Sequence, residues 1–512
     1  MKKLLSLLLA ALFVLSTCSF ALADDVQKEP ARFVIRSNSN KENKTENDKI
    51  KAMIEEQSGI DFEVIVVAEN TWNEKVNTML AGGEKFDTLN LTAGSGVWAK
   101  YAANGHIVPY TQQMLDEYLP DVVAMIPDEA WICCKDAEGN VWALPRHESF
   151  TAGGIPSIRT DWLEKLGLEM PTTLAELEAY FEGVKTTDVN GNGDPNDEYG
   201  YIPYFQSLFS GPLHVYYLGT KGECDVNDRY LDEDGTIKPW YTHPNAWALV
   251  SKAAEWYQKG YINQDYLTMT NETANDMGAA DRIGMASGWY NMGLQGTERL
   301  VAANPDSTCS WAAIPNFTDA VSGVNAWGGN PEYMAEVALS ATSTDPQWAL
   351  KLLNWIYADQ ANYMLATYGI EGDHYILTDD GKYFTQPDGA TDRYMLEYQL
   401  LEWYDYSKDP EPYYSKETST WRAYTAWEMR NQIYAGIKAI APFDYYVPYD
   451  MNDTDAEFLN DDAQTLIKES MEKALVGDLT EEQWNEAVNT AWDIDGKIRS
   501  AVWTEQYHNF VD

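Results

Sequence analysis

The sequence predicts an α/β protein built from more than one domain. Strand-like and helix-like segments alternate along its first hundred residues, which is typical of a mostly parallel sheet flanked by helices. The chain has 512 residues, enough for two or more domains and a large core. It contains no internal repeat and no low-complexity tract, so a repeat architecture is not expected.

The first predicted elements follow one another at short intervals. Runs of apolar, β-branched and aromatic residues predict strands at residues 32–36, 62–67 and 86–91. Helical periodicity predicts helices between these strands, at residues 47–58 and 71–80. Gly59 ends the first helix and the Ala81-Gly82-Gly83 run ends the second, because glycine readily adopts the backbone conformation that closes a helix.

Helices dominate the later part of the chain. Apolar residues at helical spacing predict helices at residues 174–185, 246–259, 346–358, 461–475 and 481–492. Thr172 and Thr173, with Glu176 downstream, mark the start of the first of these, because their side chains can satisfy the free N–H groups of a first helical turn. The last hundred residues are expected to be largely helical.

Two asparagines stand where predicted strands end. Asn38 lies in the polar stretch 37–40 after the first strand, and Asn90 begins the stretch 90–95 at the end of the third. In parallel sheets, ligands bind beyond the carboxyl ends of the strands, which makes both asparagines candidate ligand contacts. The same residue types also form ordinary loops.

The N-terminus has the pattern of an export signal. Met1-Lys2-Lys3 is cationic, residues 4–15 form an apolar run, and Ala21-Leu22-Ala23 offers small residues for cleavage, so residues 1–23 are predicted to be a signal peptide. The run from Leu15 to Cys18 also resembles a bacterial lipobox, which would place a lipid anchor on Cys18, although Thr17 fits that pattern poorly and cleavage after Ala23 is favoured. No other apolar stretch is long enough to cross a bilayer. We expect a secreted or cell-surface-attached protein.

Composition excludes several classes of function. The formal net charge is -44 and no cluster of Lys and Arg is visible, so a nucleic-acid-binding surface is not expected. The cysteines of the mature chain, among them the adjacent pair Cys133 and Cys134, form neither a disulfide framework nor a zinc pattern. The 19 Trp and 33 Tyr are in excess, and their flat faces with a polar edge suit stacking on sugar rings as well as core packing.

A polar loop at residues 188–199 predicts a calcium site. Oxygen-bearing side chains occupy loop positions one, three, five, seven and nine, and a glycine stands sixth to allow the sharp turn, an arrangement that suits a hard cation. The acidic residue usual at position twelve is replaced by Tyr199 and preceded by an acidic pair. The predicted ligands are Asp188, Asn190, Asn192, Asp194, Asn196, Asp197 and Glu198. The alternative is a turn whose side chains bond only the local backbone.

The chain resembles the family-one extracellular solute-binding proteins of bacterial ABC transporters, in their long lipoprotein-type subgroup. Residues 158–174, which begin Ile-Arg-Thr-Asp-Trp-Leu, are similar to the subgroup's "iR.DWLdkLGl..PtTldEl" block, and residues 368–375 are similar to its "yGieG.hY" block. The loop that begins at Asp188 matches its "D.NGNG..DE" pattern, and residues 136–145 resemble "dGkvyalP". The resemblance spans essentially the whole mature chain.

This resemblance implies a two-lobed clamp with a ligand cleft between discontinuous α/β lobes, which closes about a hinge. The expected lobes are residues 24–155 with roughly 325–400, and residues 156–324 with roughly 401–512. The resemblance also implies a structural calcium ion in the Asp188 loop, remote from the cleft. It implies a monomer that binds a small-molecule ligand, most often an oligosaccharide, and delivers it to ABC permease subunits.

Aromatic residues along the cleft walls stack on carbohydrate in members of this type. Trp289 and Tyr290 follow the apolar run 283–285, so they are expected where a strand meets the cleft. The chain is expected to cross between the lobes near residues 150–158 and 311–327. Further candidates stand near these crossings, after the calcium loop or on an aromatic-rich helix: Trp327, Trp421, Tyr204, Arg146 and Glu148. For each of these residues, core packing is the competing interpretation.

Two other classes of protein compete with the interpretation as a solute-binding protein of an ABC transporter. A secreted glycoside hydrolase would need two carboxylates beside the scissile bond, and with 80 Asp and Glu no pair stands out. A sensory binding protein, or one for peptide-like or cationic solutes, would use the same closing clamp. Catalytic motifs such as a nucleophile elbow or HExxH are absent from the sequence, so a non-enzymatic protein is expected.

Overall fold

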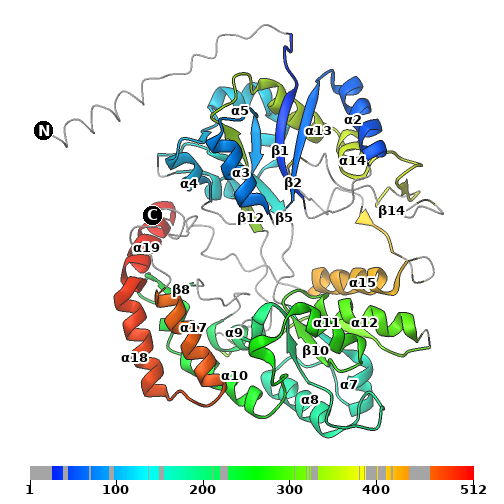
Figure 1. The fold of residues 1–512 in the computed structure, drawn as a ribbon, viewed down its shortest axis with the longest axis vertical. Helices are drawn as coiled ribbons and strands as arrows, with labels where there is room; N and C mark the ends of the chain where they lie inside the picture. Colours follow the sequence, from blue (N-terminus) through cyan, green and yellow to red (C-terminus); the bar gives the residue numbers. More distant parts are fainter. Residues whose placement is uncertain are drawn as a thin grey trace, which may run out of the picture.

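The α/β class is confirmed, and the protein has two separate hydrophobic cores. The computed structural model describes residues 26–37, 44–68, 71–91, 97–136, 138–148, 155–209, 211–219, 229–304, 306–318, 320–321, 323, 332–379, 381–385, 387, 400–401, 411–414, 416, 419–436 and 462–511. One core draws on residues 31–144 and 335–401, and the other on residues 155–317 and 429–491. We call the corresponding halves the upper and lower lobes, after their places in Figure 1. The exact lobe boundaries given above, at residues 155/156, 324/325 and 400/401, stay a prediction.

The upper lobe contains a six-stranded sheet. Its order is β2-β1-β3-β12-β4, and β5 also pairs with β12. The strands are β1 (Ala31–Ser37), β2 (Phe62–Ala68), β3 (Thr88–Asn90), β4 (Ile107–Val108), β5 (Ala143–Glu148) and β12 (Glu332–Ser340). β1 runs parallel to β2 and β3, whereas β12 is antiparallel to β3, β4 and β5. The sheet is therefore mixed rather than mostly parallel, because β12 enters it from the opposite direction after the lower-lobe segment.

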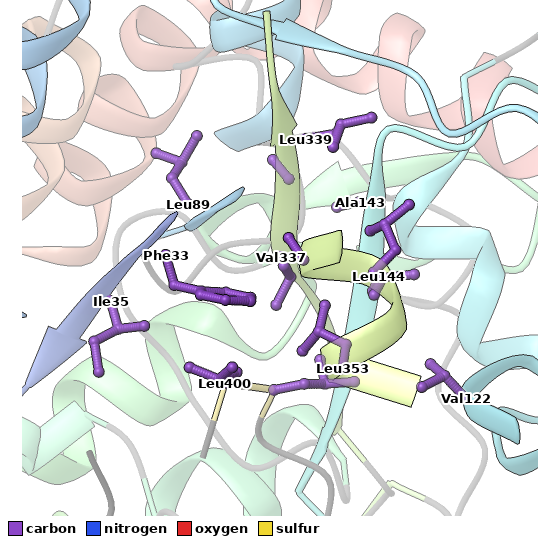
Figure 2. Packing of buried hydrophobic residues seen from close by; sticks show 14 of the residues in the cluster. Phe33, Ile35, Leu89, Val122, Ala143, Leu144, Val337, Leu339, Leu353 and Leu400 are labelled. Atoms are coloured by element: carbon purple, nitrogen blue, oxygen red, sulfur yellow. The ribbon is translucent and has the colours of Figure 1, made fainter. Parts of the chain in front are cut away.

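Helices flank this sheet. They are α2 (Lys44–Ser58), α3 (Trp72–Ala81), α4 (Val97–Ala103), α5 (Gln112–Tyr118), α6 (Pro120–Met125), α13 (Gln347–Ala358) and α14 (Gln360–Tyr368), with a 3-10 helix η2 (Asp128–Cys134). Figure 2 shows how the core joins residues from the two chain segments of the upper lobe: Phe33 and Leu89 lie beside Val337 of β12 and Leu353 of α13. Burying each such side chain stabilises the fold by roughly 1.5–3 kcal/mol, so the two chain segments fold as one unit.

The lower lobe is built around a small sheet of order β11-β6-β10-β7. Its strands are β6 (Ser157–Arg159), β7 (Ile202–Pro203), β10 (Met285–Ser287) and β11 (Trp311–Ala313). β10 runs parallel to β7 and antiparallel to β6. The surrounding helices are α7 (Thr160–Leu166), α8 (Leu174–Thr186), α9 (Pro212–Leu218), α10 (Ala246–Gln258), α11 (Asn271–Ala279), α12 (Met292–Ala303), α15 (Trp421–Gly436), α17 (Asp462–Leu475), α18 (Glu481–Ala491) and α19 (Lys497–Val511).

Short elements complete the fold. A hairpin joins β8 (Arg229–Leu231) and β9 (Ile237–Pro239), and a three-stranded sheet joins β13 (Ile376–Leu377), β14 (Tyr383–Thr385) and β15 (Glu411–Pro412). The helical turns η3 (Tyr204–Phe209), η4 (Trp240–Thr242), η5 (Tyr266–Thr268) and η7 (Trp492–Gly496) connect larger elements. Within the described part of the chain, every helix is too short or too polar to span a bilayer.

The predicted start of α8 is confirmed in atomic detail. The Thr173 hydroxyl accepts a hydrogen bond from the N–H of Glu176 at 3.3 Å, and the Glu176 carboxylate accepts one from the N–H of Thr173 at 3.1 Å. These reciprocal bonds satisfy two donors that the first turn leaves free. They fix the position at which the chain turns into α8, just ahead of the loop that begins at Asp188.

Glycines allow α11 and α12 to approach closely. A Cβ atom on Gly296 would lie 2.0 Å from the carbonyl oxygen of Asn275, and one on Gly278 would lie 3.1 Å from the Cα of Gly296. We expect Gly296→Ala to separate the two helices and lower the free energy of unfolding by about 1–3 kcal/mol in urea titrations. Gly183→Ala in α8 is the control, because its Cβ would meet only the movable end of the Leu166 side chain, at 3.0 Å. Equal losses in the two variants would contradict this account.

Candidate ligand residues and calcium loop

The predicted calcium loop forms a tight turn on the lower lobe. The Asp188 carboxylate accepts hydrogen bonds from the N–H groups of Gly191 at 2.8 Å and Gly193 at 2.9 Å. Asn190 Oδ1 accepts one from the N–H of Asn192 at 2.9 Å. Both glycines have positive φ angles, 77° and 94°, which other residues rarely adopt. The backbone is thus curled around its own side-chain oxygens.

Two acidic residues close the loop. Asp197 Oδ2 accepts a hydrogen bond from Asn192 Nδ2 at 3.0 Å and pairs with Arg282 at 3.0 Å. Glu198 is only 4% exposed; its Oε1 accepts the N–H of Asn190 at 3.1 Å, while its buried Oε2 has no hydrogen-bond partner. Burial raises the pKa of the Glu198 carboxyl above its ordinary value. A buried carboxylate oxygen without a donor is costly, and a cation is a partner that would satisfy it.

The donor set of the loop fits a hard cation that takes neutral as well as charged oxygens. Among the residues that the structure describes, no three acidic, His or Cys side chains gather closely enough to hold a metal alone. An ion would therefore draw on the amide oxygens of Asn190 and Asn192 as well as on carboxylates. Asp194 accepts a hydrogen bond from the N–H of Asn196 at 3.1 Å, and both side chains are exposed. Tyr199, at loop position twelve, forms a backbone β-bridge with Ile283, and the buried Glu198 is the acidic side chain just before it.

Sequence reasoning missed the support of this loop. Asn190 Nδ2 donates to the carbonyl oxygen of Asp281 at 3.1 Å. Asp281 has a φ of 61°, the single positive φ of a non-glycine residue among those described, and its carboxylate pairs with Arg159 at 2.5 Å. Arg159 is 2% exposed and also forks onto both oxygens of Asp161 at 2.7 Å. The loop is thus connected through Asp281 to the ion pairs of the buried Arg159. In the sequence, the Arg-x-Asp-Trp stretch at residues 159–162 was the one indication of these ion pairs.

Trp289 is placed where a ligand could touch it. It follows β10 after Gly288 and precedes α12, and it is the only exposed tryptophan among the described residues, with 37% of its surface accessible. Its neighbour Tyr290 is half-buried and packs against the lower core. Tyr201 and Ser287 hydroxyls lie 2.5 Å apart, which joins β10 to the chain segment that enters β7. The strand end that carries Trp289 is therefore firmly held.

Two other lower-lobe candidates pack into the protein. Trp421 is the first residue of α15 and is half-buried against the lower core. Tyr204 is 1% exposed, and its hydroxyl donates to Asn275 Oδ1 at 3.2 Å. Burial raises its pKa. Tyr204 thus belongs to the core and has almost no surface to offer a ligand in this conformation.

The upper-lobe candidates lie toward one end of the sheet. Asn90 ends β3 and is buried opposite Val337, and Arg146 and Glu148 lie at the end of β5, where Glu148 pairs in register with Glu332. β5 ends at Glu148, and Ile155 already belongs to the lower core, so this sheet end lies within about 25 Å of the lower lobe.

The structure therefore brings Asn90, Arg146 and the backbone of Glu148 to the inter-lobe side. It does not join them to Trp289 or Trp421, which lie on the lower lobe. Asn38 and Trp327 lie outside the described residues, as do the predicted signal peptide and Cys18.

Comparisons of sequence identify relatives of this chain. It is 24% identical to Lipoprotein LipO of Bacillus subtilis over 375 residues, which cover 72% of this chain and 71% of LipO. It is 27% identical over 288 residues to the fructooligosaccharide ABC transporter substrate-binding protein FusA of Streptococcus pneumoniae, covering 51% and 52% of the two chains.

Comparisons of structure show the same fold. An HMO-binding, ABC-transporter-associated solute-binding protein of Bifidobacterium longum infantis superposes with a TM-score of 0.71 at 20% identity, over 95% of this chain and 100% of that one. An EF-hand mutant of FusA in complex with fructo-nystose has a TM-score of 0.65, and the alginate-binding protein AlgQ2 without calcium ion has one of 0.66. Both are 16% identical to this chain and cover 94% of it and 99% of their own chains.

The family model of the bacterial extracellular solute-binding proteins matches residues 41–363, which is more than half of the chain. The protein belongs to this family, and it is therefore an extracytoplasmic solute-binding protein of the ABC-transporter type and not an enzyme.

Proposed function

We propose that this protein captures an oligosaccharide between its lobes and delivers it to the permease subunits of an ABC importer as a monomer. The observation that carries the proposal is the exposed indole of Trp289 at the end of β10, since indole faces stack well on sugar rings. The names of FusA and of the Bifidobacterium protein support the same class of ligand. The Arg146 and Asn90 side of the upper sheet would supply the polar contacts that orient sugar hydroxyls.

Calorimetric titration of the mature protein tests this proposal. The panel contains fructooligosaccharides, other neutral oligosaccharides, acidic oligosaccharides, peptides and cationic solutes. We expect one class of oligosaccharide to bind with one molecule per chain and to be recovered intact. Binding of a peptide or a cationic solute alone would overturn the carbohydrate assignment, and recovery of shortened glycans would indicate a hydrolase.

Trp289→Ala is expected to weaken binding of that oligosaccharide about tenfold or more, because the stacking face is lost while the fold is kept. Trp355→Ala is the matched control, since Trp355 is half-buried on α13, and its loss should leave the affinity unchanged. Equal affinities of the Trp289 variant and the unaltered protein would remove this residue from the site.

We also propose that residues 188–198 hold a structural calcium ion. The orphaned Oε2 of Glu198 and the Asn190 and Asn192 amides support this assignment, together with the EF-hand and calcium named for FusA and AlgQ2. When bound, the ion would join the two ends of the loop through oxygen ligands. The residues of this chain then keep the loop fixed against Asp281.

A further inference from the structure

A hollow of about 360 Å³ lies at the three-stranded sheet of β13, β14 and β15 and is lined by Thr378, Asp379, Tyr383 and Tyr413. β14 pairs in parallel with β15, and the N–H of Tyr413 donates to the carbonyl oxygen of Phe384 at 2.7 Å. This bond places Tyr413 beside Tyr383, with ring centroids 5.8 Å apart and planes at 60°. Two aromatic rings that are distant in the sequence, one on β14 and one directly after β15, thus meet at one hollow.

The turn that carries the polar side of the hollow is firmly closed. The N–H of Thr378 donates to the carbonyl oxygen of Tyr383 at 2.8 Å, and the N–H of Tyr383 donates to Thr378 Oγ1 at 3.1 Å. Gly381 N–H bonds the Thr378 carbonyl at 2.8 Å. These bonds fix the turn that carries the exposed Asp379, which also lines the hollow.

The aromatic surface continues from the hollow to a candidate ligand helix. The Tyr413 ring contacts the Trp427 ring of α15 at 5.4 Å and 71°. Trp427 lies six residues after Trp421, which corresponds to about 9 Å along the helix axis. In Figure 1, α15 lies on the upper side of the lower lobe, and the β14 label lies above it on the same side of the molecule. Ring contacts thus connect the hollow to the helix that begins at the half-buried Trp421.

We propose that the hollow is an outer saccharide subsite, which receives a sugar unit at one end of a longer oligosaccharide. This inference rests on the proposed function and extends it to chain-length selection. Tyr413 is 42% exposed and offers a stacking face, and Asp379 offers a carboxylate that accepts hydrogen bonds from sugar hydroxyls. An aromatic face with a carboxylate at its rim matches a neutral sugar, which is apolar on one face and rich in donors at its edge.

Titration with a chain-length series of the preferred oligosaccharide tests the subsite. We expect Tyr413→Ala to weaken binding of the longest glycan about tenfold and binding of the shortest less than twofold. Tyr413→Phe should keep the affinity for the longest glycan, because its ring still stacks. Asp379→Asn should weaken binding of the longest glycan by a smaller factor than Tyr413→Ala does. Ile376→Ala is the control, because Ile376 is exposed on β13 of the same sheet and does not line the hollow.

The outcomes separate the two proposals. If Tyr413→Ala leaves the affinity for the longest glycan unchanged, or weakens binding of every chain length equally, the proposed outer subsite is wrong, but the proposal of saccharide binding stands. If the unaltered protein binds no oligosaccharide of any length, both the proposed function and the subsite are overturned. A thermal midpoint of Tyr413→Ala equal to that of Ile376→Ala shows that the losses do not come from unfolding.

Discussion

Replacing Arg159 by leucine is expected to lower the free energy of unfolding by about 3–5 kcal/mol, because it leaves the buried carboxylate of Asp161 and the half-buried carboxylate of Asp281 without their cation. Arg159 Nε and Nη2 each donate to Asp161 at 2.7 Å, and Nη1 donates to Asp281 at 2.5 Å. The guanidinium also lies 4.5 Å from the Trp162 ring centroid. Leucine fills part of the volume but supplies none of these donors. Urea unfolding followed by circular dichroism measures the loss.

Arg299→Leu provides the matched control for this prediction. Arg299 also pairs with two carboxylates, Asp276 at 3.0 Å and Glu272 at 3.4 Å, but it is 48% exposed. Exposed pairs contribute about 0–1 kcal/mol because water and salt screen them. If the free energy of unfolding falls equally in the two variants, the buried ion pairs of Arg159 stabilise the fold no more than exposed ones do.

Removal of calcium is expected to have the second large effect. A free calcium concentration about a thousand times the dissociation constant of the site stabilises the folded state by about 4 kcal/mol, and a chelator removes that stabilisation. The thermal midpoint of the unaltered protein should therefore fall with chelator and recover with added calcium. Glu198→Gln should abolish this response, because it keeps an oxygen for the N–H of Asn190 but removes the buried charge.

Asp234→Asn controls for a general effect of removing an acidic turn residue. Asp234 lies in the exposed turn between β8 and β9, where it accepts a hydrogen bond from the N–H of Thr236 at 2.9 Å, outside the loop of residues 188–198. This variant should keep the full response to calcium. A thermal midpoint of the unaltered protein that does not depend on calcium or chelator would show that residues 188–198 form only a turn.

The sequence predicted elements whose causes are local. The helix predicted at residues 174–185 is α8, Leu174–Thr186, since its cap and its apolar periodicity lie within one segment. The strand predicted at 86–91 shortens to Thr88–Asn90, because pairing with β1 and β12 decides where a strand ends. Among the described residues, Cys133, Cys134 and Cys309 form no disulfide.

What could not be predicted depends on residues far apart in the chain. The antiparallel entry of β12 brings Val337 beside Asn90, and no local pattern encodes that register. The pair of Arg159 with Asp281 spans 122 residues, so the sequence showed the arginine but not its partner. The pairing of Tyr413 with Tyr383 could not be predicted for the same reason, since the two residues are far apart in the chain. The position of Tyr204 shortly after the loop of residues 188–198 does not reveal that its side chain is buried in the core.

Small-angle X-ray scattering with and without the preferred oligosaccharide tests the central claim most directly. The two lobes have separate cores, so they can move as rigid bodies about their connections. We predict that a saturating oligosaccharide reduces the radius of gyration, and that the glycan is recovered uncleaved from the same sample. A scattering curve that stays unchanged at saturation would contradict the closing clamp.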